Sequence, residues 1–311
     1  MKIGITPWQP RERSALGLTA QAQRAEQLGY DAFWLPENHF NPDAIPDPLM
    51  LLAAVAASTS RIRLATTSYL LPLRHPLQAA EQVAVLDQLS GGRVILGVGR
   101  GYAAPTFKAF AVSARHKRSL FEASLTTMVR AWSGAPVCID EAADECVVLD
   151  PLPVQRPHPP LWVAAFGPKA LAQAGRLGLP YLASPVEPLE VLEQNYERHR
   201  EAVAEAGATP PQEIPVMRSL FVTDDARQTR EVREDLQELA AASGRLPQGA
   251  AVEDWSIVGE SAYVGERVEE YRERLGMTHL VVARLRLGGL DPQRVEASVA
   301  RTVEILGKGE P

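Results

Sequence analysis

A carboxyl group, an amide and an imidazole follow one another in the segment PENHF, as Glu37, Asn38 and His39. The segment comes directly after the apolar run AFWL at residues 32–35, which is typical of a buried strand. A histidine exchanges a proton near neutral pH, and a neighbouring carboxylate can orient its ring. These three residues are therefore candidate catalytic residues for proton transfer. A hydrogen-bonded polar pair at the surface is the alternative interpretation.

A lysine stands at the expected start of a helix, in the segment Gly167-Pro168-Lys169 that follows the apolar run LWVAAF. Free backbone N–H groups at a helix start, the helix dipole and a lysine together suit a phosphate group. An ordinary strand-to-helix turn with proline at the first helical position is the alternative.

Glycines recur in the segment GVGRGY, which runs from Gly97 to Tyr102. The segment departs from the dinucleotide-binding pattern GxGxxG, because Tyr102 stands where the last glycine is required. These glycines could instead let a planar ligand approach the backbone closely.

The sequence lacks the usual motifs for a metal site or a serine nucleophile. The histidines show no HxH or HExxH spacing, and there is no GxSxG segment. Cys138 and Cys146 form no CxxC pair, and we expect them to be structural residues, buried as free cysteines usually are, rather than redox or catalytic groups. Because the sequence offers neither a metal-ligand motif nor an activated nucleophile, we expect a bound organic cofactor to supply the chemistry.

The elements that position these residues alternate between short β-branched runs and amphipathic helical stretches. Strands are predicted at residues 2–6, 32–35, 63–71, 93–99, 161–166, 181–183, 214–222 and 279–284. Eight strand–helix units predict an α/β fold with a parallel sheet closed into a (β/α)8 TIM barrel; an open doubly wound sheet is the alternative. The candidate residues follow strands, where the functional groups of such barrels gather.

The whole chain, residues 1–311, is expected to form one barrel domain with insertions near 133–160 and 224–258. The second insertion is expected to be helical, with a loop around residues 243–254. A net charge of −6 argues against a nucleic-acid partner, which prefers a basic face. No apolar run approaches the roughly 20 residues of a membrane span, and no signal peptide is evident, so we expect a cytoplasmic protein.

Three segments resemble the luciferase-like flavin monooxygenases. They are GYDAFWLPENHF at residues 29–40, the stretch from RIRLATTSYLL to GVGRGY at residues 61–102, and PPLWVAAFGPKALAQAGRLGLP at residues 159–180. A weaker similarity returns at residues 257–284. The resemblance implies a luciferase-like TIM barrel with FMN at the carboxyl ends of the strands.

Carried over to matching positions, the resemblance implies a set of cofactor contacts. Thr67 and Ser68 match a site where the family often has a cis peptide bond against the flavin ring. Arg100 and Tyr102 match residues beside the flavin, and Arg118 matches an arginine that binds its phosphate. The phosphate-side segment matches Ala165, Phe166, Gly167, Pro168 and Lys169.

Two departures from the family pattern bear on the reaction. Asn38 stands where luciferases have the histidine that serves as their acid–base group, so His39 is our candidate for proton transfer. Phe166-Gly167 stands where luciferases have Glu-Ser, so backbone amides would contact the phosphate there.

The function implied is an FMN-dependent monooxygenase that oxygenates a small organic substrate with dioxygen. A separate flavin reductase would supply the reduced FMN, and the family's barrels suggest a homodimer. One alternative is a deazaflavin-dependent dehydrogenase or reductase that transfers hydride. Others are a flavin-binding protein without turnover and, with little support, a metal-dependent barrel hydrolase.

Overall fold

A computed structural model shows a chain that divides into two compact units, which are described separately below. The first unit comprises Met1–Pro10, Arg24–Trp34 and Ala165–Pro311, and the second comprises Arg11–Gln23 and Leu35–Ala164. The structure describes residues 1–9, 14–42, 44–140, 143, 145–243, 249–283, 285, 287 and 289–307.

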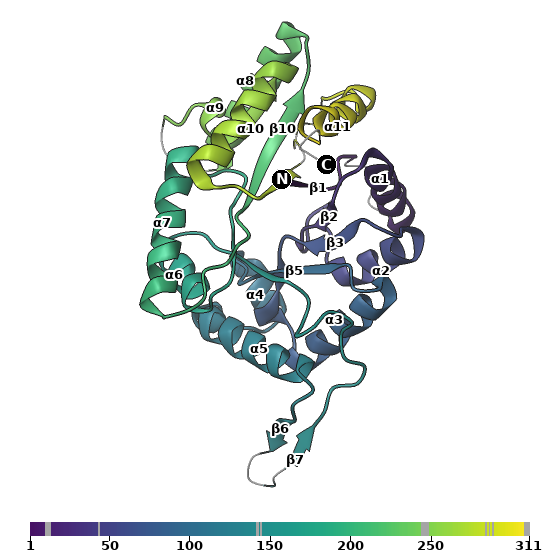
Figure 1. Cartoon of the computed structure of the whole chain (residues 1–311), viewed down its shortest axis with the longest axis vertical. Helices are drawn as coiled ribbons and strands as arrows, with labels where there is room; N and C mark the ends of the chain where they lie inside the picture. The colour runs from purple at the N-terminus through teal and green to yellow at the C-terminus, as the bar shows by residue number, and fades with distance from the viewer. Residues whose placement is uncertain are drawn as a thin grey trace. The chain divides into compact units, whose positions relative to one another are not determined.

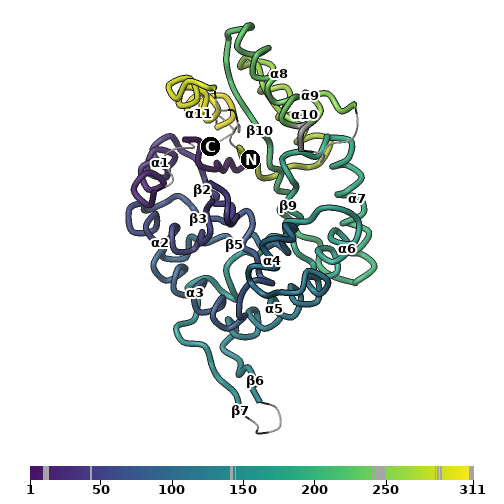
Figure 2. Tube along the Cα trace, turned by 180° about the vertical axis from the view of Figure 1, so that it is seen from behind, coloured from purple at the N-terminus to yellow at the C-terminus, as the bar shows by residue number. Residues whose placement is uncertain are grey.

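The second unit carries a parallel sheet. In it β5 (Val94–Gly99) pairs with β3 (Arg63–Thr66), with β4 (Tyr69–Leu70) and with β8 (Leu161–Ala164). All six residues of β5 are buried, as expected for a central parallel strand. Its helices and helical turns are α2 (Pro48–Ser58), η1 (Leu71–Leu73), α3 (Pro76–Ser90), α4 (Ala104–Ala109), η2 (Ala114–His116) and α5 (Lys117–Trp132). In Figure 2, α3 and α5 run side by side.

The predicted strand at residues 63–71 is two strands, and the single-strand prediction was wrong. The ladder breaks at Thr67 and Ser68, whose peptide bond is cis, as the family resemblance implied. The Thr67 amide donates to the carbonyl of Leu35, 2.8 Å away. Every residue in this run is compatible with a strand, so its local pattern shows no break.

The first unit carries the other parallel pairs. Here β1 (Lys2–Ile5) lies between β2 (Ala32–Leu35) and β12 (His279–Ala283), while β10 (Pro215–Val222) pairs with β12 and with β11 (Ser256–Gly259). A bridge from Ala183 to Val216 joins β10 to the end of β9 (Tyr181–Leu182). The helices are α6 (Pro168–Arg176), α7 (Leu189–Glu205), α8 (Ala226–Ser243), α9 (Val252–Trp255), α10 (Ser261–Leu275) and α11 (Pro292–Leu306); α1 (Ala15–Leu28) contributes to both units.

The predicted insertion at residues 224–258 contains two helices and an unpredicted strand. The helices α8 and α9 confirm its helical character (Figure 1). The strand β11 extends the sheet beside β10. The helices and strands enclose a small core of their own, formed by Phe221, Val232, Leu236, Val252, Trp255 and Val258. Of the loop predicted around residues 243–254, positions 244–248 lie outside the described residues, as does residue 284 of the predicted eighth strand.

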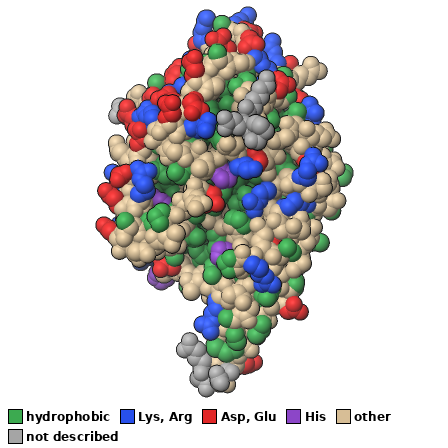
Figure 3. All heavy atoms as spheres, in the orientation of Figure 1, with side chains coloured by type: hydrophobic (Ala, Val, Ile, Leu, Met, Phe, Trp, Pro, Cys, Tyr) green, Lys and Arg blue, Asp and Glu red, His purple; other side chains and the backbone are tan. Residues whose placement is uncertain are grey.

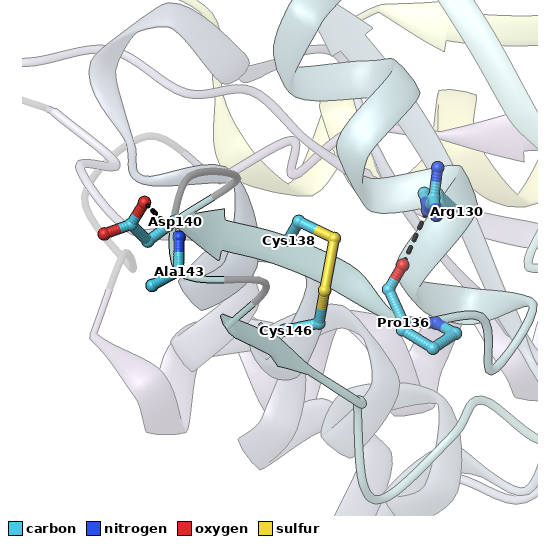
Figure 4. Close-up of a disulfide and its surroundings, with 6 residues drawn as sticks. All are labelled: Arg130, Pro136, Cys138, Asp140, Ala143 and Cys146. Carbon is cyan, nitrogen blue, oxygen red and sulfur yellow. Dashed lines mark hydrogen bonds between the residues drawn. A yellow bond between two sulfur atoms is a disulfide. The ribbon is translucent and has the colours of Figure 1, made fainter.

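The predicted insertion at residues 133–160 contains an antiparallel hairpin of β6 (Val137–Asp140) and β7 (Glu145–Val147). Cys138 and Cys146 face each other across it and form a disulfide (Figure 4). Both cysteines are exposed, so the expectation of free, buried thiols was wrong. The pairing depends on the register of the hairpin, which local composition does not reveal.

A buried polar network stabilises the first unit around Glu187. Its carboxylate accepts hydrogen bonds from the Tyr181 hydroxyl, the Ser184 amide and the Asn195 side chain at 2.7–2.8 Å, and its backbone carbonyl accepts from Arg218 at 2.7 Å. Burial raises the pKa of Glu187 above its ordinary value, and the hydrogen bonds from Tyr181 and Ser184 oppose this shift.

We expect Glu187→Gln to lower the free energy of unfolding by about 1–3 kcal/mol, since the amide places a donor against buried donors. A raised pKa in the folded state stabilises the fold most below the unfolded value near 4.5, and this contribution is lost as pH rises through the folded pKa. The loss of unfolding free energy caused by Glu187→Gln should therefore be larger at acidic than at neutral pH. Chemical denaturation at several pH values checks this, with Glu197→Gln in the exposed Glu197–Arg200 pair as the control. A penalty independent of pH would contradict the assignment.

Candidate functional site

Glu37 lies just beyond the end of β2 in the second unit, with its side chain fully enclosed. Its Oε1 accepts hydrogen bonds from Arg74 and from the His39 ring, each at 2.8 Å. Its Oε2 accepts from the backbone amide of Leu70 at 2.9 Å. A buried carboxylate is stable only when such donors replace water. Glu37 therefore fixes the position of the His39 ring.

The His39 ring has a defined orientation. Its Nε2 faces the Glu37 carboxylate, which accepts hydrogen bonds, so Nε2 carries a hydrogen and Nδ1 is the ring nitrogen that Glu37 does not engage. The arrangement resembles a histidine held by a carboxylate in general acid–base sites. Geometry thus brings together two of the three residues predicted to be catalytic.

Asn38, the third of them, closes the loop that carries His39. Its backbone amide donates to the Ile45 carbonyl at 3.1 Å, and its side-chain oxygen accepts from the Ile45 amide at 3.0 Å. These two bonds join Asn38 to Ile45. Asn38 therefore shapes the loop that presents His39.

Ser68 packs against β5 at Gly99. A Cβ atom at Gly99 would lie 2.1 Å from the Ser68 Oγ and 2.9 Å from its Cβ. Glycine is required here by a neighbouring side chain, whereas the sequence suggested close approach of a ligand. The contact fixes Thr67 and Ser68 at the end of β5, next to Arg100.

We expect Gly99→Ala to lower the free energy of unfolding by about 1–3 kcal/mol, because the added methyl group overpacks this junction. Chemical denaturation measures the effect. Gly289→Ala is the matched control, since a Cβ there meets no atom within 4 Å. Equal losses in both variants would argue against the contact with Ser68.

Three cations, named here the cation group, gather after β5 and at the start of α5: Arg100, Lys117 and Arg118. Burial lowers the pKa of Arg100 to about 10, with a further contribution from the charge of Arg118. Burial also lowers the pKa of Lys117, as do the charges of Arg118 and Arg100. Burial is the larger cause of both shifts, and the charge of Arg118 contributes to each of them, so the three positive charges lie close enough to interact. An anion would stabilise such an arrangement.

Leu70 and Gly101 connect the cation group to the Glu37–His39 pair. The Lys117 ammonium donates to the Gly101 carbonyl at 3.2 Å, and the Leu70 side chain lies beside Gly101. The Leu70 amide in turn binds Glu37. A chain of contacts within the second unit therefore links the Glu37–His39 pair, named here the proton-transfer pair after its predicted role, to the cation group.

The remaining predicted residues take two positions. Tyr102 is three-quarters exposed at the surface of the second unit. The segment Ala165–Lys169 belongs to the first unit, where Gly167 (φ +81°) precedes α6 and Phe166 is exposed. Its contact with a phosphate stays a prediction.

Sequence reasoning missed Arg74, Lys117 and Phe110 as members of the site. Arg74 lies in the predicted loop after the third strand, and Lys117 lies in the noticeably basic run RHKR at residues 115–118, so both had a local signal. Phe110 had none, because its contact with His39 depends on the fold.

A surface cavity of about 580 Å³ lies between α7 and α10 in the first unit and contains none of these residues. Its charged side chains already pair with one another, as in Arg274 with Glu193 and Arg200 with Glu197. On the face drawn in Figure 3, acidic and basic side chains are interspersed. We assign it no function.

Within the described residues, no group of three histidine, cysteine or acidic side chains has the arrangement of a metal site. Likewise, none of the described helices combines the length and the apolar character needed to cross a membrane.

Comparison with known proteins identifies relatives across the chain. A family model described as luciferase-like monooxygenase matches residues 3–279. The F420-dependent glucose-6-phosphate dehydrogenase of Beutenbergia cavernae is 29% identical over 299 residues, covering 85% of this chain and 86% of that protein. The chain spans about half the length of several other curated relatives, at 26–38% identity.

Two solved structures show the same fold. Monooxygenase RslO1 from Streptomyces bottropensis matches with a TM-score of 0.82 and 26% identity over 98% of each chain. The oxygenating constituent of 3,6-diketocamphane monooxygenase from Pseudomonas putida, solved with FMN, matches with a TM-score of 0.80 and 22% identity over 97% of this chain and 96% of that one. The predicted luciferase-like α/β barrel is thereby confirmed as the fold class.

Proposed function

Because the chain belongs to the luciferase-like monooxygenase family, we propose that it is an FMN-dependent monooxygenase acting on a small organic substrate. The observation that carries the proposal is the chain of contacts in the second unit that links the Glu37–His39 pair to the cation group through Leu70 and Gly101. This site offers an anchor for an anionic cofactor and a proton-transfer group within one contiguous set of contacts.

The cation group fits the phosphate of FMN. Arg118 and Lys117 lie at the start of α5, and the charges they share with Arg100 would be offset by a phosphate dianion. When bound in its reduced form, FMN supplies two electrons and two hydrogens: one oxygen atom of dioxygen enters the substrate and the other leaves as water. Thr67, Ser68 and Tyr102 are proposed to flank the ring.

His39 is the proposed proton-transfer residue, acting through Nδ1. Glu37 is a positioning residue that holds Nε2, and Arg74 neutralises the buried Glu37 carboxylate through a 2.8 Å ion pair. Because Arg74 also binds the Leu70 carbonyl, this ion pair fixes the segment on both sides of Leu70. The ring of His39 is thus held ready in one orientation before a substrate binds.

A deazaflavin-dependent hydride transfer is the second candidate. It is favoured by the dehydrogenase relative, which aligns over most of the chain. The cation group would suit a phosphate group on either cofactor. Such an enzyme would reduce or oxidise its substrate without using dioxygen, and a flavin-binding protein without catalytic activity would do neither.

Calorimetric titration of the full chain with FMN, with reduced FMN and with the deazaflavin coenzyme separates these candidate functions. We expect reduced FMN to bind most tightly, and product formed with isotopically labelled dioxygen to carry one labelled oxygen atom. Preference for the deazaflavin would replace the proposal with hydride transfer. Binding without turnover would favour the non-catalytic role, and absence of any flavin binding would refute the central proposal.

Two partners complete the proposal: a separate flavin reductase and a second copy of the chain. Support for a homodimer comes from α3, where Val85 and Leu89 are exposed one helical turn apart. We expect the wild-type protein to have a mass in solution of twice the monomer mass, and we expect Leu89→Glu to reduce it to the monomer mass. A monomer mass for the wild-type protein would exclude the dimer.

A further inference from the structure

Two phenylalanine rings stand exposed beside the proton-transfer pair. Phe40 is 69% exposed and Phe110 is 41% exposed, although large apolar side chains are generally buried. Their ring centroids lie 5.8 Å apart, and the His39 ring lies 5.7 Å from Phe40 and 4.9 Å from Phe110. We name these three residues the aromatic cluster.

The backbone holds Phe40 in an unfavourable conformation to present its ring. Its φ angle is +61°, in the left-handed region that bulky residues rarely adopt. Ala111, which directly follows Phe110, has a φ of +55°. Left-handed residues other than glycine tend to occur at functional sites, where a particular side-chain position offsets the cost.

The polar groups next to the cluster restrict what it can bind. The Glu37 carboxylate is enclosed and accepts from Arg74, His39 and Leu70, so it presents no negative charge to a ligand. His39 Nε2 is occupied by Glu37, so Nδ1 is the nitrogen through which the largely buried His39 side chain would pair with a polar atom of a ligand. The cluster therefore combines two apolar ring surfaces with a single hydrogen-bonding nitrogen.

The position of the cluster suits a substrate. Phe110 ends α4, whose Phe107 ring lies beside Gly101 and beneath the Lys117 ammonium at 5.8 Å. One face of this segment therefore adjoins the cation group, and Phe110 adjoins His39. A molecule on the cluster would contact the proton-transfer nitrogen while an anion occupied the cation group.

We propose that the aromatic cluster recognises the substrate, and that this substrate is a neutral, apolar compound built on a ring with one carbonyl or hydroxyl oxygen. The ring of the substrate packs against Phe40 and Phe110, and its oxygen pairs with His39 Nδ1. Ring-on-ring contacts favour offset or tilted geometries at centroid distances like those already present in the cluster. The inference rests on the proposed function and specifies its substrate class.

Calorimetric binding of 2-naphthol, compared with the linear aldehyde n-decanal, tests this inference on the full chain with and without saturating FMN. Phe40→Gly removes one ring and suits the left-handed backbone, while Phe110→Leu keeps an apolar side chain without a ring. We expect each variant to lower the affinity for 2-naphthol about three- to tenfold and to lower the affinity for decanal less. Val148→Ala, another exposed apolar residue of the second unit, is the control and should bind as the wild type does.

The FMN titration on the same samples separates the two proposals. Two results overturn the substrate class and leave the monooxygenase proposal standing, provided that FMN binds normally. In the first, 2-naphthol does not bind. In the second, decanal binds more tightly than 2-naphthol, and the two phenylalanine variants weaken both ligands to the same extent. Loss of FMN binding in the wild type overturns the monooxygenase proposal, whatever 2-naphthol does. Binding of 2-naphthol that neither phenylalanine variant weakens also overturns the inference.

Discussion

Replacing His39 with glutamine is expected to lower the turnover of the oxygenation by about 10²–10⁴, the usual contribution of a general acid–base group. Glutamine keeps a hydrogen-bonding side chain near Glu37 but cannot exchange a proton near neutral pH. Glu37 engages Nε2 of the His39 ring, so the proposed proton transfer uses Nδ1, and glutamine has no atom that can replace Nδ1 in this role. Steady-state turnover with reduced FMN, dioxygen and a ring-bearing substrate measures the effect.

His75→Gln is the matched control for this variant. His75 is exposed at the start of α3 and makes no capping hydrogen bond with its side chain. FMN affinity should stay unchanged in both variants, since neither histidine belongs to the cation group. Unchanged turnover in His39→Gln would show that another group moves the proton.

Replacing Lys117 and Arg118 together with alanine is expected to weaken FMN binding by about 10²–10³-fold. Each charge-assisted hydrogen bond to a phosphate contributes about 1.5–3 kcal/mol, reduced here because Arg118 is exposed. Riboflavin, which has the same ring system without the phosphate, should lose little affinity. The comparison isolates the phosphate contact from general damage to the ring site.

The same contact predicts a pH dependence. A bound phosphate favours the protonated cations, so affinity is retained below their pKa values and falls as pH rises through them. The pKa of Arg100 is lowered to about 10 and that of Lys117 is lowered as well, so FMN affinity should decline on the alkaline side earlier than for unperturbed side chains. Riboflavin binding should not show this decline.

Arg115→Ala is the control for charge removal, because Arg115 is exposed in the adjacent turn η2 and lies outside the cation group. Its effect on FMN affinity should be small and should disappear at high ionic strength. Equal weakening of FMN and riboflavin in the double variant would place the phosphate elsewhere, with residues 165–169 as the next candidates.

Local sequence determined the strands and helices whose signals lie within a few residues. The run AFWL forms β2 with the predicted bounds, Gly91 ends α3 in a left-handed conformation, and Asp291 with Pro292 begins α11. Apolar periodicity, a capping side chain and the freedom of glycine act over one turn or one strand, so they can be recognised without the fold. The family resemblance further implied the barrel fold, which is confirmed, and it marked Thr67-Ser68 as a site where the family often has a cis bond, which this chain contains.

Tertiary structure alone decided which residues meet. Arg74 reaches Glu37 across 37 positions, Phe110 reaches His39 across 71, and β11 forms only because β10 provides its partner. Cys138 and Cys146 meet through the register of a hairpin. Contacts of this kind depend on chain reversals and on the pairing of distant strands, whose energies are spread over many residues. Glu37 and His39 were therefore recognisable from the sequence, whereas the orientation of His39 and its contact with Phe110 required the fold.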